Sequence, residues 1–204
     1  LSNQSQKELI TKKAEEINKL QQDISKQMEA EESFDVFISF KATNKNGEKT
    51  EDSVIAREIY EELTKKKYKV FFSEKTLENR IGSEYEPIIF KALHTAKVFI
   101  LVGTSKENID SAWVRNEWAR YIERINSDPT LSRSSFIPVF KDMNPYDMPK
   151  INNSYIQGVD ALKLGYVYTI ADGVEKILAP DSEKEILATF DNIDNMIEFE
   201  RIRK

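Results

Sequence analysis

Cysteine is absent from the 204 residues of the chain. Its absence excludes disulfide bonds, thiolate nucleophiles and cysteine-based zinc sites. Glycine is scarce, with six residues, and the chain contains neither a Gly-x-Gly-x-x-Gly pattern nor a Gly-x-x-x-x-Gly-Lys-Ser/Thr phosphate loop. Rossmann-type cofactor binding and P-loop hydrolysis are therefore disfavoured.

The chain has a single histidine, His94, so a Ser-His-Asp mechanism would depend on that residue alone. It follows Ala92 and Leu93 in a helical pattern, where a structural histidine is far more frequent than a catalytic one. The acidic residues show no spacing typical of a metal site. We therefore expect neither a bound metal nor a cofactor.

Charge and hydropathy exclude further classes. The 35 acidic and 30 basic residues give a net charge of -5, which provides no broad attraction to nucleic acid or to an anionic membrane. No apolar run approaches the roughly 20 residues that a membrane helix needs, and the N-terminus lacks the apolar core of a signal peptide. We expect a cytoplasmic protein.

The two ends of the chain are predicted to be helical extensions of a central domain. Residues 1–32 contain no glycine or proline, and Ile10, Ile17 and Ile24 lie seven apart. This pattern fits a dimerising coiled coil, and it fits equally a helix packed on the surface of its own domain. Residues 180–204 again place apolar side chains at helical spacing.

Between these extensions, residues 33–179 alternate short apolar runs with helical patterns. The runs cover residues 34–40, 68–72, 97–102, 136–140 and 159–162. Such alternation predicts an α/β domain of the flavodoxin-like kind, with five mostly parallel strands and helices on both faces of the sheet.

Several details of this domain can also be predicted. The third run is the most apolar and should be central, whereas Pro138 in the fourth run argues for an edge or bulged strand. A helix is expected over 52–66, with either Thr50 or Asp52 as its cap. A short last helix is expected over 171–178.

The segment Ser83-Glu84-Tyr85-Glu86-Pro87 marks the start of a helix after the second strand. In an open parallel sheet this position faces the crevice where ligands bind. Taken alone, the Ser-x-x-Glu pattern favours a capping role for Glu86 over a catalytic one. Glu84, on the same turn, is a second candidate for either role.

A second group of candidates is Trp113-x-x-x-Glu117. The two residues are four apart and so share one face of a helix. The alternative is a core tryptophan with a glutamate that pairs with Arg120 or Lys141, and the local pattern slightly favours this alternative.

Taken together, the motifs resemble those of Toll/interleukin-1 receptor (TIR) domains. The segment 34–40 is similar to their opening box. Residues 69–73, followed by a loop and by 82–86, look like their second strand, their long loop and the helix that carries the glutamate of the NAD-cleaving members. Trp113-x-x-x-Glu117 resembles the Trp-x-x-x-Glu of the same enzymes, and the bacterial branch is the most similar.

This resemblance implies the TIR fold and an NAD+ glycohydrolase or cyclase, with NAD+ as substrate and Glu86 as the catalytic residue. The substrate-binding residues that it implies are Phe40, Lys41, Ser73 and Trp113. Glu84 and Glu117 would have supporting roles. Self-association through TIR contacts is implied as well, and the alternative is a TIR adaptor that signals by protein contact and does no chemistry.

Overall fold

The computed structural model describes residues 33–72 and 85–179. The expected helical extensions, 1–32 and 180–204, lie outside the described residues, as does the segment 73–84. None of the described helices is long and apolar enough to cross a membrane.

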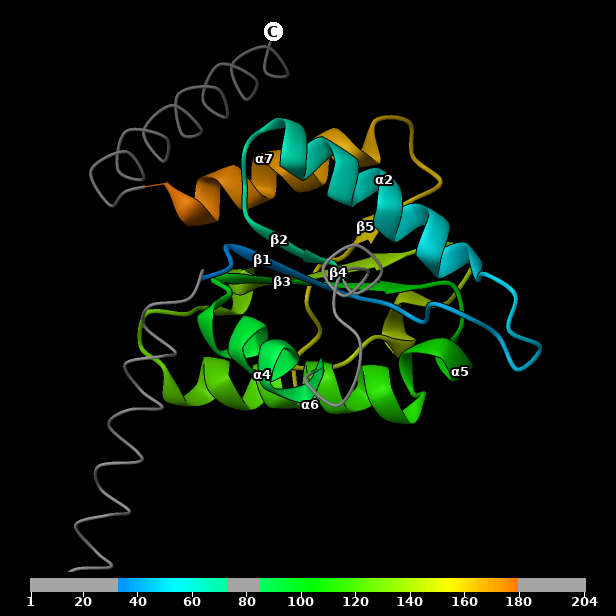
Figure 1. Cartoon of the computed structure of the whole chain (residues 1–204), viewed down its shortest axis with the longest axis horizontal. Coiled ribbons are helices and arrows are strands. Elements are labelled where there is room, and N and C mark those ends of the chain that lie inside the picture. The colour runs from blue at the N-terminus through cyan, green and yellow to red at the C-terminus, as the bar shows by residue number, and fades with distance from the viewer. Residues whose placement is uncertain (1–32, 73–84, 180–204) are drawn as a thin grey trace, which may run out of the picture. The chain divides into compact units, whose positions relative to one another are not determined.

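The core of the domain is one sheet of five parallel strands (Figure 1). The strands are β1 (Val36–Ser39), β2 (Val70–Phe72), β3 (Val98–Gly103), β4 (Phe136–Phe140) and β5 (Val159–Asp160). Their spatial order is β2-β1-β3-β4-β5, which is the order of flavodoxin-like folds. The predicted fold class is confirmed, and so is the central place of β3.

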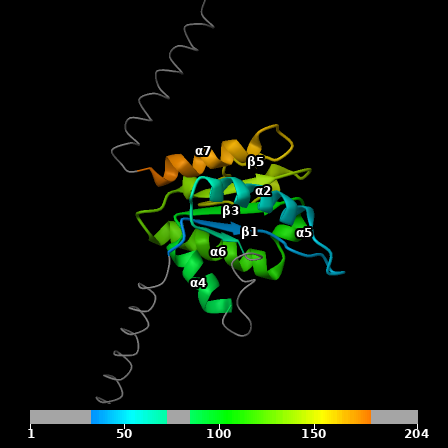
Figure 2. The same cartoon turned by 45° about the horizontal axis from the view of Figure 1, so that its top comes forward.

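Helices cover both faces of the sheet (Figures 1 and 2). Helices α2 (Glu51–Lys65) and α7 (Tyr166–Leu178) lie on one face, and α4 (Tyr85–Thr95) and α6 (Ala112–Ser127) lie on the other, with the short α5 (Lys106–Ile109) beside α6. Because both faces are covered, the strands are mostly apolar instead of alternating with polar residues. The polar residues in them are Ser39, at the end of β1, and Asp160, at the end of β5.

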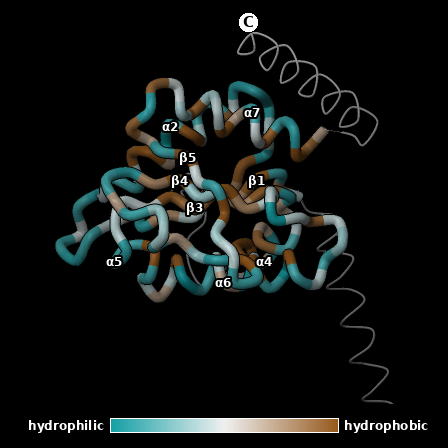
Figure 3. The backbone as a smooth tube through the Cα atoms, turned by 180° about the vertical axis from the view of Figure 1, so that it is seen from behind, coloured by the Kyte–Doolittle hydropathy of each residue, from teal (hydrophilic) through white to brown (hydrophobic). Residues whose placement is uncertain are grey.

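Side chains of successive strand residues point to opposite faces and build two separate apolar clusters. Val36 and Ile38 belong to the cluster beneath α2 and α7. Phe37 belongs to the cluster beneath α4 and α6, where it stacks on Phe71 at 4.7 Å and on Phe99 at 5.3 Å between ring centroids. Figure 3 shows the apolar stretches gathered at the central strands.

The start of α2 decides between its two cap candidates. Thr50 is the cap, because its side chain accepts a 3.2 Å hydrogen bond from the backbone N–H of Ser53. Thr50 also donates to the backbone oxygen of Lys41, which fixes the helix start beside the end of β1. Asp52 has a different role, described below.

The prediction for Pro138 was wrong, since β4 lies between β3 and β5. The short length of β5 explains the difference. It pairs with Val139 and Phe140 of β4 and has no residue in register with Pro138. The missing N–H of the proline therefore disturbs no pairing with β5.

Helix α7 begins five residues earlier than the predicted start at Ala171. Its first turn contains tyrosine, valine and threonine, which favour strands by intrinsic preference. Gly165 precedes it in a left-handed conformation with φ of 78°, and burial of Ile170 and Val174 stabilises the helix against the sheet. Tertiary packing thus outweighs local preference here.

Candidate active site

The carboxyl end of β1 meets the amino-terminal half of α6 at the edge of the sheet where ligands bind in open parallel folds. The chain leaves β1 toward β2 on one side, and β3 lies on the other side. This reversal of direction opens a crevice between neighbouring connections. We therefore expect the residues at the end of β1 to line a ligand-binding site.

Ser39, the last residue of β1, is bonded to Glu117 of α6. Its hydroxyl donates a hydrogen bond of 2.6 Å to Oε2 of the glutamate. Both residues are buried, with exposed fractions of 1% for Ser39 and 6% for Glu117. A carboxylate is thus fixed at the strand end by a partner 78 residues away in the sequence.

Burial raises the pKa of the Glu117 carboxyl to about 7 from its ordinary value of 4.5. Desolvation disfavours the charged form, and the hydrogen bonds from Ser39 and Trp113 oppose the shift by stabilising it. A carboxyl that titrates near neutral pH inside a cleft is typical of functional sites, although buried structural pairs show it too.

A cavity of about 220 Å³ opens beside this pair. Four of the residues predicted from the sequence line it: Phe40, Lys41, Trp113 and Glu117. Phe40 is buried and stacks one face of its ring on Phe72, with 5.0 Å between centroids. Trp113 is half exposed, so its indole forms an outer wall of the cavity. The sheet edge, a cation and two aromatic rings therefore meet at one place.

Trp113 and Glu117 also line a second, smaller cavity of about 60 Å³ that reaches α4. Ile89 and Phe90 form its α4 side. The guanidinium of Arg120 on α6 lies over the ring of Phe90, at 4.2 Å from its centroid, an arrangement that attracts the two helices to each other.

Arg124 fixes the other end of α4 to α6. Its Nη1 donates to the backbone oxygens of Leu93, at 2.9 Å, and Ala96, at 2.7 Å. These carbonyls end a helix and lack partners within it. The orientation of α4 relative to α6 is therefore set by a charged hydrogen-bond donor, which suits the negative end of a helix dipole.

Glu86 is the second residue of α4. It precedes Phe90 by four residues, so the two positions share one face of the helix. The side chain of Glu86 lies outside the described part of the chain, as do Ser73 and Glu84 altogether. The structure therefore brings Phe40, Lys41, Trp113 and Glu117 together and leaves the assignments of Ser73, Glu84 and Glu86 as predictions.

The alternative reading of the tryptophan motif was wrong. Trp113 is 50% exposed and is no core residue. Arg120 donates to Asn116 instead of pairing with Glu117, and Lys141 pairs with Glu51. Glu117 is instead buried and accepts a hydrogen bond from the Ser39 hydroxyl at the end of β1.

Two residues at this edge, Ser39 and Asp52, were not among the predicted site residues, and Asp52 was expected only as a possible helix cap. Ser39 is recognisable in retrospect as a small polar residue inside an apolar run. Asp52 is fully buried, and its Oδ1 accepts hydrogen bonds from the backbone N–H of Thr104, at 2.9 Å, and from its hydroxyl, at 2.6 Å. These bonds hold the loop after β3 against the start of α2. Within the described residues, no three acidic or histidine side chains form a possible metal site.

Comparison with known proteins identifies the family of this chain. Residues 36–178 match the family model of the TIR domain, and the chain belongs to this family. No curated protein matches the chain.

Among solved structures, the chain is similar to a metazoan TIR-STING receptor from C. gigas in complex with 2',3'-cGAMP, with a TM-score of 0.48 and 19% identity over 69% of this chain and 39% of that one. A second structure of the receptor gives a TM-score of 0.47 and 18% identity over 72% and 41%. The TIR domains of the activated Roq1 resistosome give 0.39 and 23% over 71% and 83%. The chain thus spans about two fifths of the receptor structures.

Proposed function

We propose that this TIR domain cleaves the bond between nicotinamide and ribose in NAD+, as a glycohydrolase or cyclase of the bacterial NAD-cleaving branch. The observation that carries the proposal is the cavity at the end of β1, where Phe40, Lys41, Trp113 and Glu117 meet. The α4 face that holds position 86 borders the adjoining cavity through Phe90.

The chemistry needs little catalytic apparatus. When the C1′–N bond of NAD+ breaks, its electron pair goes to the pyridinium nitrogen, and nicotinamide leaves as a neutral molecule. No acid is needed to protonate it, unlike the leaving group of an O-glycoside. The ribose carbon acquires oxocarbenium character, and water adds there to give ADP-ribose and a proton. Attack by a base nitrogen of the same molecule gives cyclic ADP-ribose and a proton instead.

In this proposal Glu86 is the catalytic carboxylate. It hydrogen-bonds the ribose hydroxyls and stabilises the positive charge that develops in the transition state, which is commonly the largest catalytic contribution. Phe40 and Trp113 contact the rings of the substrate, and Lys41 meets its phosphates. Ser73 is a further substrate-binding residue, and Glu84 and Glu117 support the site. The reaction requires no metal or further cofactor.

Self-association is the proposed means of activation, in bacterial defence or virulence in the cytoplasm. The contacts involve the TIR domain, through residues 73–82 and the flanking helices, and the N-terminal segment 1–32 as a coiled coil. Exposed apolar side chains in the turn after β5 and in the first turn of α7 are suitable for protein contact, since Leu162, Leu164 and Tyr168 have exposed fractions of 59%, 105% and 61%. The domain division 1–32, 33–179 and 180–204 is part of the same proposal.

The same exposed residues favour a second candidate, a TIR adaptor that signals by TIR–TIR contact alone. An adaptor has no use for a carboxylate at position 86. Catalysis and adaptor function are therefore separable by a single substitution.

The test is nicotinamide release from NAD+ by the purified chain, followed by chromatography over a series of protein concentrations. Glu86→Gln keeps the size and hydrogen-bonding capacity of the side chain and removes its charge. We expect it to lower the rate by about 100-fold or more, the usual effect of losing a transition-state stabiliser. Glu84→Gln is compared with it, because Glu84 is the second candidate beside Glu86, and a supporting role should lower the rate much less than the loss of the catalytic carboxylate does.

Release that persists in Glu86→Gln would disprove the catalytic assignment. Absence of release from the wild type at every concentration, including those at which light scattering detects self-association, would favour the adaptor. Loss of activity in both variants would mean that catalysis depends on both glutamates and cannot be assigned to Glu86 alone.

A further inference from the structure

A larger cavity, of about 560 Å³, lies away from the proposed active site. Phe136 and Ile137, the first two residues of β4, form part of its wall. Because all strands are parallel, this is the opposite edge of the sheet from Ser39. The volume is within the range of roughly 300 to 1,000 Å³ that is usual for small-molecule sites.

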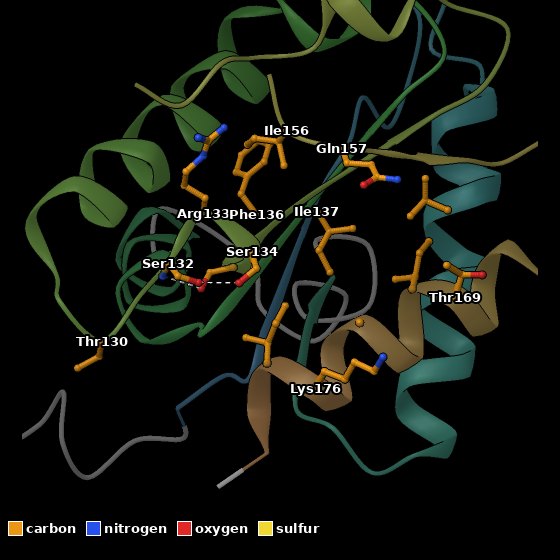
Figure 4. A pocket seen from close by; sticks show the side chains of 15 residues that line it. Thr130, Ser132, Arg133, Ser134, Phe136, Ile137, Ile156, Gln157, Thr169 and Lys176 are labelled. Atoms are coloured by element: carbon orange, nitrogen blue, oxygen red, sulfur yellow. Dashed lines mark hydrogen bonds between the residues drawn. The ribbon is translucent and has the colours of Figure 1, made fainter. Parts of the chain in front are cut away.

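The lining of this distal cavity combines an apolar floor with basic side chains. Isoleucines 137, 156, 170 and 177 contribute the floor. Figure 4 shows Lys176 from α7 and Arg133 from the turn before β4 on different sides of the cavity. None of the described residues that line it is acidic, although the whole chain has a net charge of -5. The local charge thus complements an anion.

Gly173 keeps the cavity open. It lies within α7, where a glycine costs about 1 kcal/mol relative to alanine. A Cβ added there would meet Ile137 Cδ1 at 3.7 Å, an ordinary contact, and no closer atom. Packing therefore does not require glycine at this position, and a longer side chain would occupy the cavity.

The wall opposite α7 is held by its own hydrogen bonds. Residues Arg133–Ser135 form a 3₁₀ turn whose cap residue, Ser132, exchanges hydrogen bonds with Ser135. Nη2 of Arg133 donates to the backbone oxygen of Tyr155 at 3.0 Å, which joins this turn to the segment that carries Ile156. The cavity is thus bounded by fixed elements and is formed before any ligand binds.

We propose that the distal cavity binds a small organic anion, a molecule with an apolar body and one carboxylate, sulfonate or phosphate group. The apolar body lies against the isoleucines of the floor, and the anionic group lies near Lys176. Such a site is separate from NAD+ cleavage and lies beyond the proposed function. An apolar, partly open cavity with basic residues at its rim favours this class over a neutral ligand or a cation.

The test uses the full chain and two fluorescent probes, the anion 8-anilinonaphthalene-1-sulfonate and its neutral analogue N-phenyl-1-naphthylamine. Gly173→Met fills the cavity and should abolish saturable binding of the sulfonate, whereas Gly173→Ala, which adds one methyl group, should change its Kd by less than about threefold. Lys176→Gln should raise the Kd of the sulfonate by about two- to fivefold, the range for an exposed ion pair, and should leave the Kd of the neutral probe unchanged. Thermal melting confirms that each variant is folded.

Three results would overturn the proposal. Unchanged sulfonate binding in Gly173→Met would place the probe elsewhere, and displacement of the probe by NAD+ would place it in the active site. Phe190 is one of the apolar residues of the segment 180–204. A severalfold gain in binding on Phe190→Asp, in the full chain, would mean that this segment occupies the cavity. None of these outcomes depends on catalysis, so failure here is distinguishable from failure of the NAD+ proposal.

Discussion

The hydroxyl of Ser39 donates a 2.6 Å hydrogen bond to Oε2 of Glu117, which joins the end of β1 to α6. One titratable group is thereby placed among buried apolar side chains at the floor of the candidate active site. Because the bond connects a strand to a helix, the protonation state of Glu117 contributes both to the stability of the fold and to the charge of the cavity.

We predict that the stability of the protein falls as pH rises from 5 to 8. The pKa of Glu117 is about 7 in the folded state and near 4.5 when unfolded. Between these values the folded chain binds more protons than the unfolded chain, so the contribution of Glu117 is complete below pH 4.5 and is lost as pH rises through 7. The loss is roughly 3 kcal/mol at most. Urea unfolding at pH 5, 6, 7 and 8 measures it.

Glu117→Gln isolates this contribution because glutamine cannot ionise and still accepts from Ser39. The difference between the wild type and the variant should follow the titration of one group, and a difference that is constant with pH would contradict the raised pKa. Ser39→Ala is the complementary variant. The Ser39 hydrogen bond lowers the pKa of Glu117, so its loss should raise that pKa further and should cost more at pH 8 than at pH 5, by about 1 to 3 kcal/mol.

Asp52 supports a second prediction, on the loop after β3. Asp52→Ala removes the acceptor of both Thr104 bonds and leaves a partly buried backbone N–H and a hydroxyl without this partner. We expect a loss of about 2 to 4 kcal/mol in the free energy of unfolding, the range for charged hydrogen bonds and unsatisfied groups.

Asp110→Ala is the control for this second prediction, because its carboxylate is exposed and pairs with Lys106 on the surface at 3.3 Å. It should cost less than about 1 kcal/mol. Equal losses in the two aspartate variants would show that the Thr104 contacts do not stabilise the loop.

Much of the fold was predictable because apolar runs and helical periods are local properties. The range 136–140 matches β4, and the predicted helix 52–66 differs from α2 by one residue at each end. Features that depend on distant partners were not predictable from pattern. Pro138 was expected in an edge or bulged strand because proline lacks an N–H. It is tolerated inside the sheet because β5 has only two residues, and the sequence of β4 contains no information on that length. The early start of α7 depends on packing against the sheet.

The same distinction applies to the site. Residue spacing placed Trp113 and Glu117 on one helix face, and the resemblance to TIR domains implied Phe40 and Lys41. The partner of Glu117 was not identifiable, because Ser39 is 78 residues away and no local pattern connects a strand residue to a particular helix residue. Arg120 and Lys141 were the nearer candidates by charge, but burial favours a neutral hydroxyl over the cost of enclosing a second ion.

Two glycines give opposite predictions for one substitution. At Gly103, the last residue of β3, an added Cβ would lie 2.3 Å from Cγ2 of Ile109, a buried residue of α5. Gly103→Ala must therefore displace Ile109, and we expect a loss of about 1 to 3 kcal/mol from overpacking. Gly173→Ala meets no close atom and restores a good helix former, so it should gain about 0.5 to 1 kcal/mol. Urea unfolding of both variants at one pH tests these predictions. A stabilising Gly103→Ala would mean that α5 shifts without cost to make room for the methyl group. A destabilising Gly173→Ala would mean that the distal cavity has less room than its 560 Å³ indicates.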